Sequence, residues 1–207
     1  MDWARTQSSL GLTQQFQGMR TVGVGGIDAL VCAIQSYKRA LRILRLETMP
    51  EAWAKTQTNM AIALRFLGTR QGGAKGLRLL SQAEQAYGLL LELYSKEAHP
   101  MEWARTETNM SAALTTKGRR ASSKVASRCF ERAIAACASA LEVYSEEKHP
   151  DNWGRTMNNL GNAFTEYGSR TAGSEGYAML LKGLAAYETG IRYMSTEKQT
   201  VLWAETQ

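Results

Sequence analysis

The chain has 207 residues, of which 44% are hydrophobic and 21% are charged, a composition that excludes a disordered tail and indicates a folded protein. No apolar run approaches the roughly 20 residues that a membrane span needs, so we expect no membrane partner. The net charge of +6 favours acidic partners but is too small and too dispersed to establish nucleic-acid binding.

The first residues lack the charged and apolar segments of a secretory leader, so we expect a cytoplasmic location. The three cysteines, Cys32, Cys129 and Cys137, are odd in number and show no Cys-x-x-Cys spacing. On a helix, Cys129 and Cys137 would lie about two turns apart, which is too far for a disulfide. We therefore expect three small buried hydrophobic residues, and neither a metal nor another cofactor.

A tryptophan recurs every fifty residues, and each time it opens a phrase similar to Trp-Ala-Arg-Thr-Gln. These tryptophans are Trp3, Trp53, Trp103, Trp153 and Trp203. A fixed period of about 20–50 residues is typical of solenoids, propellers and other arrays. The pattern predicts one repeat domain over residues 1–207 in which each unit contacts mainly its neighbours. Its units are residues 1–50, 51–100, 101–150 and 151–200, with a partial unit at 201–207.

The first half of each unit has the pattern of a helix with one buried face. In the second unit, Trp53, Met60, Leu64 and Leu67 recur at helical spacing over residues 52–67. A proline three residues before the tryptophan in units two to four suits the first turn of that helix. A recurring glycine is expected to end the helix in a left-handed conformation. The four glycines are Gly18, Gly68, Gly118 and Gly168.

The second half of each unit predicts another helix, preceded by a loop of eight to ten residues rich in glycine, serine and threonine. In the second unit its apolar positions are Leu80, Ala83, Tyr87, Leu90, Leu91 and Tyr94. Small residues at some of these positions allow a close approach to a neighbouring helix. One such hairpin has too little core to fold alone, so adjacent hairpins must cover its apolar stripes.

On the first helix, a basic residue and a polar residue four positions later lie side by side, away from the tryptophan stripe. An asparagine can bond the N–H and C=O groups of any peptide backbone, and the adjacent cation can bind a carboxylate. Because packed helices lie about 8–10 Å apart and an extended chain rises about 3.3 Å per residue, such pairs would meet every third residue of a linear ligand. The alternative is that these side chains bond the next hairpin and hold the stack together.

The residues also resemble a known family. The first-helix pairs Leu10-Gly11, Met60-Ala61, Met110-Ser111 and Leu160-Gly161, the Ala-x-x-x-Tyr spacing and the closing proline resemble the tetratricopeptide repeat. The resemblance covers essentially the whole chain, although the unit has fifty residues rather than about 34, as in a long variety of the repeat. It implies an all-α fold, a right-handed α-solenoid of four helical hairpins plus a partial fifth first helix.

In that family the first helices line a concave groove that holds peptides, and a basic residue followed by asparagine holds carboxylate-ended ligands. By resemblance, the peptide-binding residues are Arg5, Lys55, Asn59, Arg105, Asn109, Arg155 and Asn159, with Ser9 replacing asparagine in the first unit. A second column, two residues after each glycine, is expected to bond loop or helix-end carbonyls instead. Its members are Arg20, Arg70, Arg120 and Arg170.

The tryptophans are expected to pack against the preceding second helix, with Tyr94 and Tyr144 as partners, while Trp203 covers the end of the fourth unit. His99 and His149 precede prolines in turns and have no third group for a catalytic or metal set. The glycines of residues 23–26 lack the strand and the Lys-Ser/Thr pair of a phosphate-binding loop. No enzyme is expected.

We therefore expect a protein-interaction scaffold that binds an extended, acidic or carboxylate-bearing peptide. Two alternatives stay open. The repeat ends could associate head to tail into a ring or filament, since heterologous contacts have these two outcomes. The basic residues that recur on the first helices could also bind nucleic acid weakly, with a steep dependence on salt.

Overall fold

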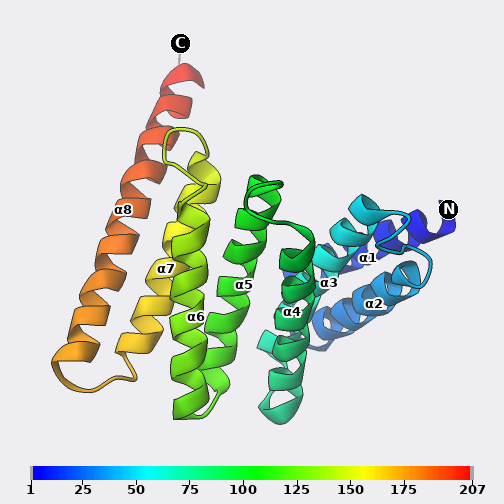
Figure 1. Cartoon of the computed structure of the whole chain (residues 1–207), viewed down its shortest axis with the longest axis horizontal. Helices are drawn as coiled ribbons and strands as arrows, with labels where there is room; N and C mark the ends of the chain where they lie inside the picture. The colour runs from blue at the N-terminus through cyan, green and yellow to red at the C-terminus, as the bar shows by residue number, and fades with distance from the viewer. Residues whose placement is uncertain (1, 206–207) are drawn as a thin grey trace. The chain divides into compact units, whose positions relative to one another are not determined.

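The computed structural model describes the backbone of residues 2–205 and the side chains of residues 2–191, and this part of the chain forms eight α-helices and no strand (Figure 1). The helices are α1 (Asp2–Arg20), α2 (Gly23–Leu41), α3 (Pro50–Arg70), α4 (Gly73–Leu93), α5 (Pro100–Arg120), α6 (Ser123–Leu141), α7 (Pro150–Gly168) and α8 (Gly173–Glu205). The all-helical fold expected from the sequence is confirmed.

The helices belong to two compact units, Met1–Leu93 with α1–α4 and Tyr94–Gln207 with α5–α8. We call them unit 1 and unit 2. Each contains two helical hairpins, and we use "repeat" from here on for the fifty-residue period of the sequence. Within each, consecutive helices pair as hairpins, and the second helix of the leading hairpin packs on the first helix of the next, α2 on α3 and α6 on α7. Direct contacts also join the two first helices of each unit, α1 with α3 and α5 with α7. Such sequential packing is consistent with a helical repeat.

The predicted helix starts are confirmed at three prolines. Pro50, Pro100 and Pro150 each stand in the first turn of a first helix, where the missing N–H has no intrahelical partner to lose. An acidic residue lies in the same turn of all three helices, next to the positive end of the helix dipole. Sequence alone therefore locates these boundaries.

The end of α8 differs from the prediction. The phrase at 201–207 was expected to begin a separate first helix, but α8 continues without a break to Glu205. The physical reason is visible at position 200, where a threonine replaces the proline that interrupts the chain fifty, one hundred and one hundred and fifty residues earlier. The side chain of Trp203 lies outside the described residues.

Of the four recurring glycines, only Gly168 ends its helix, α7, and none of the four has the expected left-handed conformation. α1, α3 and α5 run on for two residues past Gly18, Gly68 and Gly118, and none of these glycines has a positive φ. A Cβ added at Gly118 would lie 2.6 Å from the ring of Phe130 on α6. The glycine therefore lets the two helices of a hairpin approach each other closely.

The loops inside the hairpins are also shorter than the predicted eight to ten residues. Only residues 71 and 72 separate α3 from α4, because α4 begins at Gly73 with a φ of 55°. Gly23 and Gly173 have the same left-handed conformation at the start of α2 and α8. These glycines turn the chain at once from one helix to the next.

Large side chains fill the centre of each hairpin, against small ones. Tyr37, Tyr87 and Phe130, from three of the second helices, are fully buried. Cys129 and Cys137 are buried as predicted, and burial raises the pKa of the Cys137 thiol to about 11. The same prediction is wrong for Cys32, which is exposed. The positions equivalent to Cys32 in the other hairpins, 82, 132 and 182, carry Gln, Arg and Lys. The position of Cys32 therefore lies on an outer face of the second helix.

Among the described residues, no helix has the length and the apolar character that crossing a membrane requires.

Candidate peptide-binding site

In unit 1, α1 and α3 together form a pocket of about 290 Å³. Its lining combines cations, hydroxyls and an amide with apolar side chains. The lining residues are Arg5, Ser8, Ser9, Leu12, Leu44, Ala52, Lys55, Thr56 and Asn59. Three of the residues predicted to bind a peptide, Arg5, Lys55 and Asn59, therefore share one pocket. Ser9, which replaces asparagine in the first fifty-residue repeat, lines the same pocket.

The cations of this pocket point their charge toward solvent. Arg5 and Lys55 are exposed and Asn59 is half-buried. Within the described part of the chain, no side-chain hydrogen bond or ion pair engages any of the three. Below them, the hydroxyls of Ser8 and Thr56 lie 2.9 Å apart and join α1 to α3. The donors of the pocket are thus available to a ligand, on a floor that is held in place.

A second pocket of about 280 Å³ borders the first and is lined by Arg5, Met49, Pro50, Glu51 and Ala52. Arg5 and Ala52 belong to both pockets. The hollow surface therefore extends from the α1–α3 pair to the first turn of α3, with Arg5 at the junction.

In unit 2 the corresponding cations lie near a tyrosine. Arg105 on α5 and Arg155 on α7 are exposed. Burial raises the pKa of Tyr144, while the positive charges of Arg155 and Arg105 act in the opposite direction. The hydroxyl of Tyr144 donates a hydrogen bond to the carbonyl oxygen of Met101 at 3.2 Å. Unit 1 has Leu44 at this position, so the two units differ in the floor beside their cations.

Two of the side chains predicted to bind a peptide in unit 2 already form hydrogen bonds within the protein. Asn159 donates from Nδ2 to the carbonyl oxygen of Thr108 on α5, at 3.1 Å, and Arg155 donates to Oδ1 of Asn152 at 3.2 Å. One of the two amide protons of Asn159 thus bonds the neighbouring first helix, and its second proton and its carbonyl oxygen remain for the predicted contact with a peptide. Asn109 is half-buried on α5 and remains a predicted peptide-binding residue.

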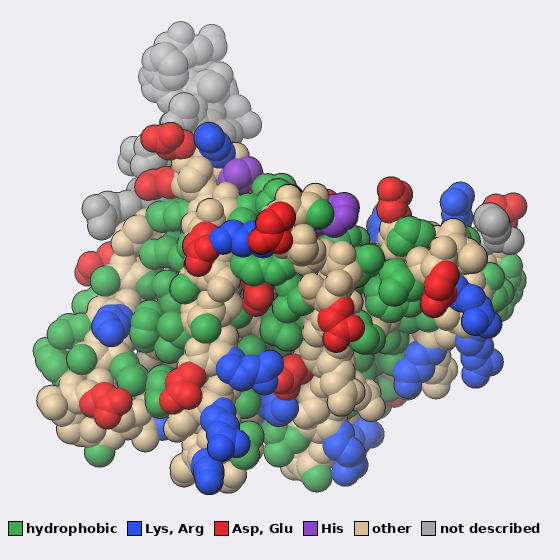
Figure 2. Space-filling view, viewed as in Figure 1, with side chains coloured by type: hydrophobic (Ala, Val, Ile, Leu, Met, Phe, Trp, Pro, Cys, Tyr) green, Lys and Arg blue, Asp and Glu red, His purple; other side chains and the backbone are tan. Residues whose placement is uncertain are grey.

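The histidines lie immediately before helices, as predicted. His99 precedes α5 and its ring contacts Tyr94 edge-on at 5.3 Å, while His149 precedes α7 with its ring 5.7 Å from that of Tyr144. Within the described residues, no group of three His, Cys, Asp or Glu side chains is placed to hold a metal ion. On the face shown in Figure 2, basic and acidic side chains are interspersed and do not form one basic patch.

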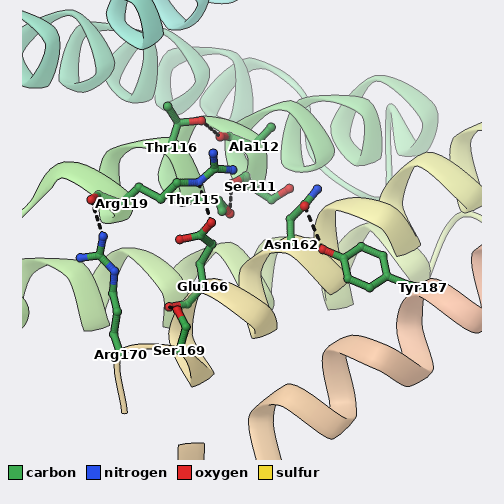
Figure 3. A network of polar contacts seen from close by, with 10 residues as sticks. All are labelled: Ser111, Ala112, Thr115, Thr116, Arg119, Asn162, Glu166, Ser169, Arg170 and Tyr187. Atoms are coloured by element: carbon green, nitrogen blue, oxygen red, sulfur yellow. Dashed lines mark hydrogen bonds and ion pairs between the residues drawn. The ribbon is translucent and has the colours of Figure 1, made fainter. Parts of the chain in front are cut away.

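Two of the arginines after the glycines, Arg70 and Arg170, bond helix ends, as predicted. Arg70 donates from Nη1 to the carbonyl oxygens of Gly18 and Thr21, at 2.5 and 2.9 Å, and from Nη2 to that of Met19 at 3.1 Å. In unit 2, Arg170 donates to the carbonyl oxygen of Arg119 (Figure 3). Each arginine thus closes the end of the preceding first helix.

An ion pair that the sequence did not suggest accompanies this contact. Nε of Arg119 lies 3.0 Å from Oε1 of Glu166, so α5 and α7 are joined at the same end by a charge pair and by the bond from Arg170 (Figure 3). The fifty-residue period relates Arg119 to Met19, Thr69 and Ser169, so the other repeats have no basic residue for an equivalent ion pair.

We expect Arg70→Met to lower the free energy of unfolding of unit 1 by about 1.5–3 kcal/mol, the usual contribution of hydrogen bonds to a charged group. Methionine keeps most of the aliphatic length but donates nothing to the three carbonyls. Urea unfolding checks this, with Arg78→Met, an exposed cation on α4, as the control. Equal losses in the two variants would contradict a helix-closing role for Arg70.

Neither a scan against protein-family models nor a search of curated proteins finds a match for this chain. Its resemblance to the tetratricopeptide repeat rests on its own periodic residues, with which the observed sequence of helix pairs is consistent.

Proposed function

We propose that the chain is a tetratricopeptide-like scaffold that binds an extended, carboxylate-bearing peptide along its first helices. The observation that supports this most is the pocket shared by α1 and α3. There two exposed cations and an amide gather beside hydroxyls and apolar side chains, and the described residues offer none of the three a partner. The proposal includes no catalytic step.

The chemistry of the pocket fits a segment of peptide. Arg5 and Lys55 supply charged donors for carboxylates, which form the stronger class of hydrogen bond. Asn59 can accept from a backbone N–H and donate to a backbone C=O. Leu12, which is half-buried in the pocket lining, gives an apolar surface for one side chain of the ligand. A volume of about 290 Å³ suits a few groups of a linear ligand better than a large folded one.

Unit 2 supplies a second, less complete set. Arg105 and Arg155 give it two exposed cations, and Asn109 contributes an amide. Asn159 adds its carbonyl oxygen and one amide proton, since the other proton of its Nδ2 bonds Thr108. The stronger binding is therefore proposed for unit 1, although Ser9 stands there in place of one asparagine.

The test is a fluorescence-anisotropy titration with labelled hexaglutamate. Arg5→Ala together with Lys55→Ala is expected to weaken binding about tenfold or more, since loss of one charged hydrogen bond alone corresponds to about 1.5–3 kcal/mol and 1.4 kcal/mol to a factor of ten. The unfolding midpoint should stay nearly constant, because neither cation bonds another described residue.

The matched control is Lys38→Ala together with Arg39→Ala, which removes the same charge from exposed positions on α2. It should leave hexaglutamate binding within about twofold of the unmodified chain, a change below 0.5 kcal/mol. Equal losses in the two double variants would show that general positive charge, and not the pocket, attracts the probe. Displacement by an oligothymidylate with a steep salt dependence would favour the nucleic-acid alternative instead.

A further inference from the structure

An apolar face of α8 is exposed. Tyr177, Leu180, Leu181, Leu184 and Ile191 are between 38% and 64% exposed. Their spacings of three, four and seven residues place them on one side of the helix. A helix with such a stripe normally buries it against another element, so this face is open to a covering element.

The repeat itself shows what covers this face. Leu30 of α2 corresponds to Leu180 by the fifty-residue period, and both lie against the glycine of their own first helix, Gly18 and Gly168. Leu30 is nevertheless fully buried, whereas Leu180 is 38% exposed. The difference is the next first helix, because α3 packs on α2 and no described helix follows α8.

Unit 2 shows the same arrangement in side-chain detail. Phe130 of α6 occupies the equivalent position and is fully buried. Its ring lies 5.8 Å from that of Tyr167 on α7, and the guanidinium of Arg170 lies 5.8 Å from the ring centre. The element that covers this face is thus a first helix. It presents the residue at position 17 and the arginine at position 20 of its fifty-residue repeat, here Tyr167 and Arg170.

α1 has an exposed face of this kind. Trp3 is 53% and Leu10 is 44% exposed, and with Gln17 they stand seven residues apart on one side of the helix. Their counterparts on α7 face the preceding hairpin, where Trp153 packs against Ala104, Ala140 and Tyr144. α1 therefore offers the covering surface that α8 lacks.

The polar groups match as well. Arg20 is exposed and bonds no other described side chain or carbonyl, although Arg70 and Arg170 in the same column close the preceding first helix. The acceptor exists at the end of α7. A Cβ at Gly176 would lie 1.9 Å from the oxygen of Thr171, and one at Gly26 would lie 2.0 Å from that of Thr21. The carbonyl of Thr171 therefore has the same position relative to its helix as the carbonyl of Thr21, which accepts a hydrogen bond from Arg70.

We propose that copies of this chain associate head to tail, with α1 of one copy covering the apolar face of α8 of another. Gln17 and Leu10 lie over Leu180 and Leu184, and Arg20 donates to the carbonyls that end α7. The two surfaces are different, so each bound copy leaves one of each kind free. Association then continues from copy to copy or closes into a ring.

Two substitutions block the two surfaces separately. Leu184→Glu places a charge on the α8 face, and Trp3→Glu places one on the α1 face. Both side chains are more than half exposed, so both variants should fold, as circular dichroism checks. Val24→Glu, at an exposed apolar residue outside both faces, is the control.

Sedimentation of the whole chain is measured over a wide range of concentration. The unmodified chain and Val24→Glu should exceed the monomer mass of 22.9 kDa increasingly with concentration, and each blocked variant alone should remain monomeric. An equimolar mixture of the two blocked variants should form dimers and nothing larger, because one intact surface of each kind remains.

Three results would overturn the proposal. The unmodified chain could remain monomeric throughout, or the mixture could fail to dimerise although both variants fold. Loss of association in Leu184→Glu alone, with Trp3→Glu unaffected, would show that two α8 faces pair with each other. Arg20→Ala gives a further readout, with a dissociation constant raised about tenfold, and an unchanged constant would exclude the bond to the end of α7.

Discussion

Replacing Phe130 with alanine is expected to lower the free energy of unfolding of unit 2 by about 3–5 kcal/mol. The ring is fully buried and touches three separate parts of the unit: Gly118 on α5, Tyr167 on α7 and the guanidinium of Arg170. Because helices border the ring on two sides, the site has little freedom to collapse around the space that alanine leaves. Urea unfolding followed by circular dichroism gives the loss.

Val125→Ala is the control for this prediction, since it shortens a side chain that is 43% exposed on the same helix. Its effect should be within about 0.5 kcal/mol, as for most surface substitutions. A Phe130→Ala loss as small as that of Val125→Ala would mean that position 130 does not join the two hairpins of unit 2.

Gly118→Ala should lower the free energy of unfolding by about 1–2 kcal/mol. Two effects compete, since alanine gains roughly 0.5–1 kcal/mol over glycine inside a helix but overpacking a core costs about 1–3 kcal/mol. The new Cβ would stand 2.6 Å from the ring of Phe130, which is buried and cannot swing away, so the cost of overpacking prevails. Urea unfolding again measures the change.

Gly88→Ala provides the opposite case. Gly88 lies within α4, and a Cβ there meets nothing within 4 Å, so only the helix-propensity gain remains and stability should rise by roughly 0.5–1 kcal/mol. The loss at Gly118 should also shrink in a Phe130→Leu background, because contacting residues couple. A stabilising Gly118→Ala would contradict the close approach of α5 and α6.

The sequence predicted the features that depend on local chemistry. The prolines located the helix starts, and the position of Arg70 after a glycine predicted bonds to helix-end carbonyls. The packing of Trp153 beside Tyr144 was also predicted correctly. Trp3 differs from it and is half exposed, because no described helix packs over this side of α1.

The sequence did not distinguish a glycine that ends a helix from one that lets another helix approach. Gly68 has the spacing of a helix end, yet its φ is not positive and Leu80 lies against it. The left-handed residue is Gly73, five positions later. Once the second helix is known to begin there, the long loop disappears, so one misassigned glycine accounts for both errors.

For the candidate site, the fifty-residue period relates Arg5 of α1 to Lys55 of α3, and the two side chains line one pocket. The fate of the amides depends on the register between two helices, which spacing along one helix does not determine. Asn159 reaches the carbonyl of Thr108, whereas Asn59 lines the open pocket of unit 1. Ser9, which replaces asparagine in the first repeat, lines the same pocket.

The most direct test of peptide binding by the first helices is an NMR titration of the isotope-labelled chain with hexaglutamate. The largest shifts are predicted for the backbone amides of Arg5, Ser9, Lys55 and Asn59, and these shifts should vanish in the Arg5→Ala and Lys55→Ala double variant. Shifts concentrated on α2 around Lys38 and Arg39, and unchanged in that variant, would contradict the assignment of the site to α1 and α3.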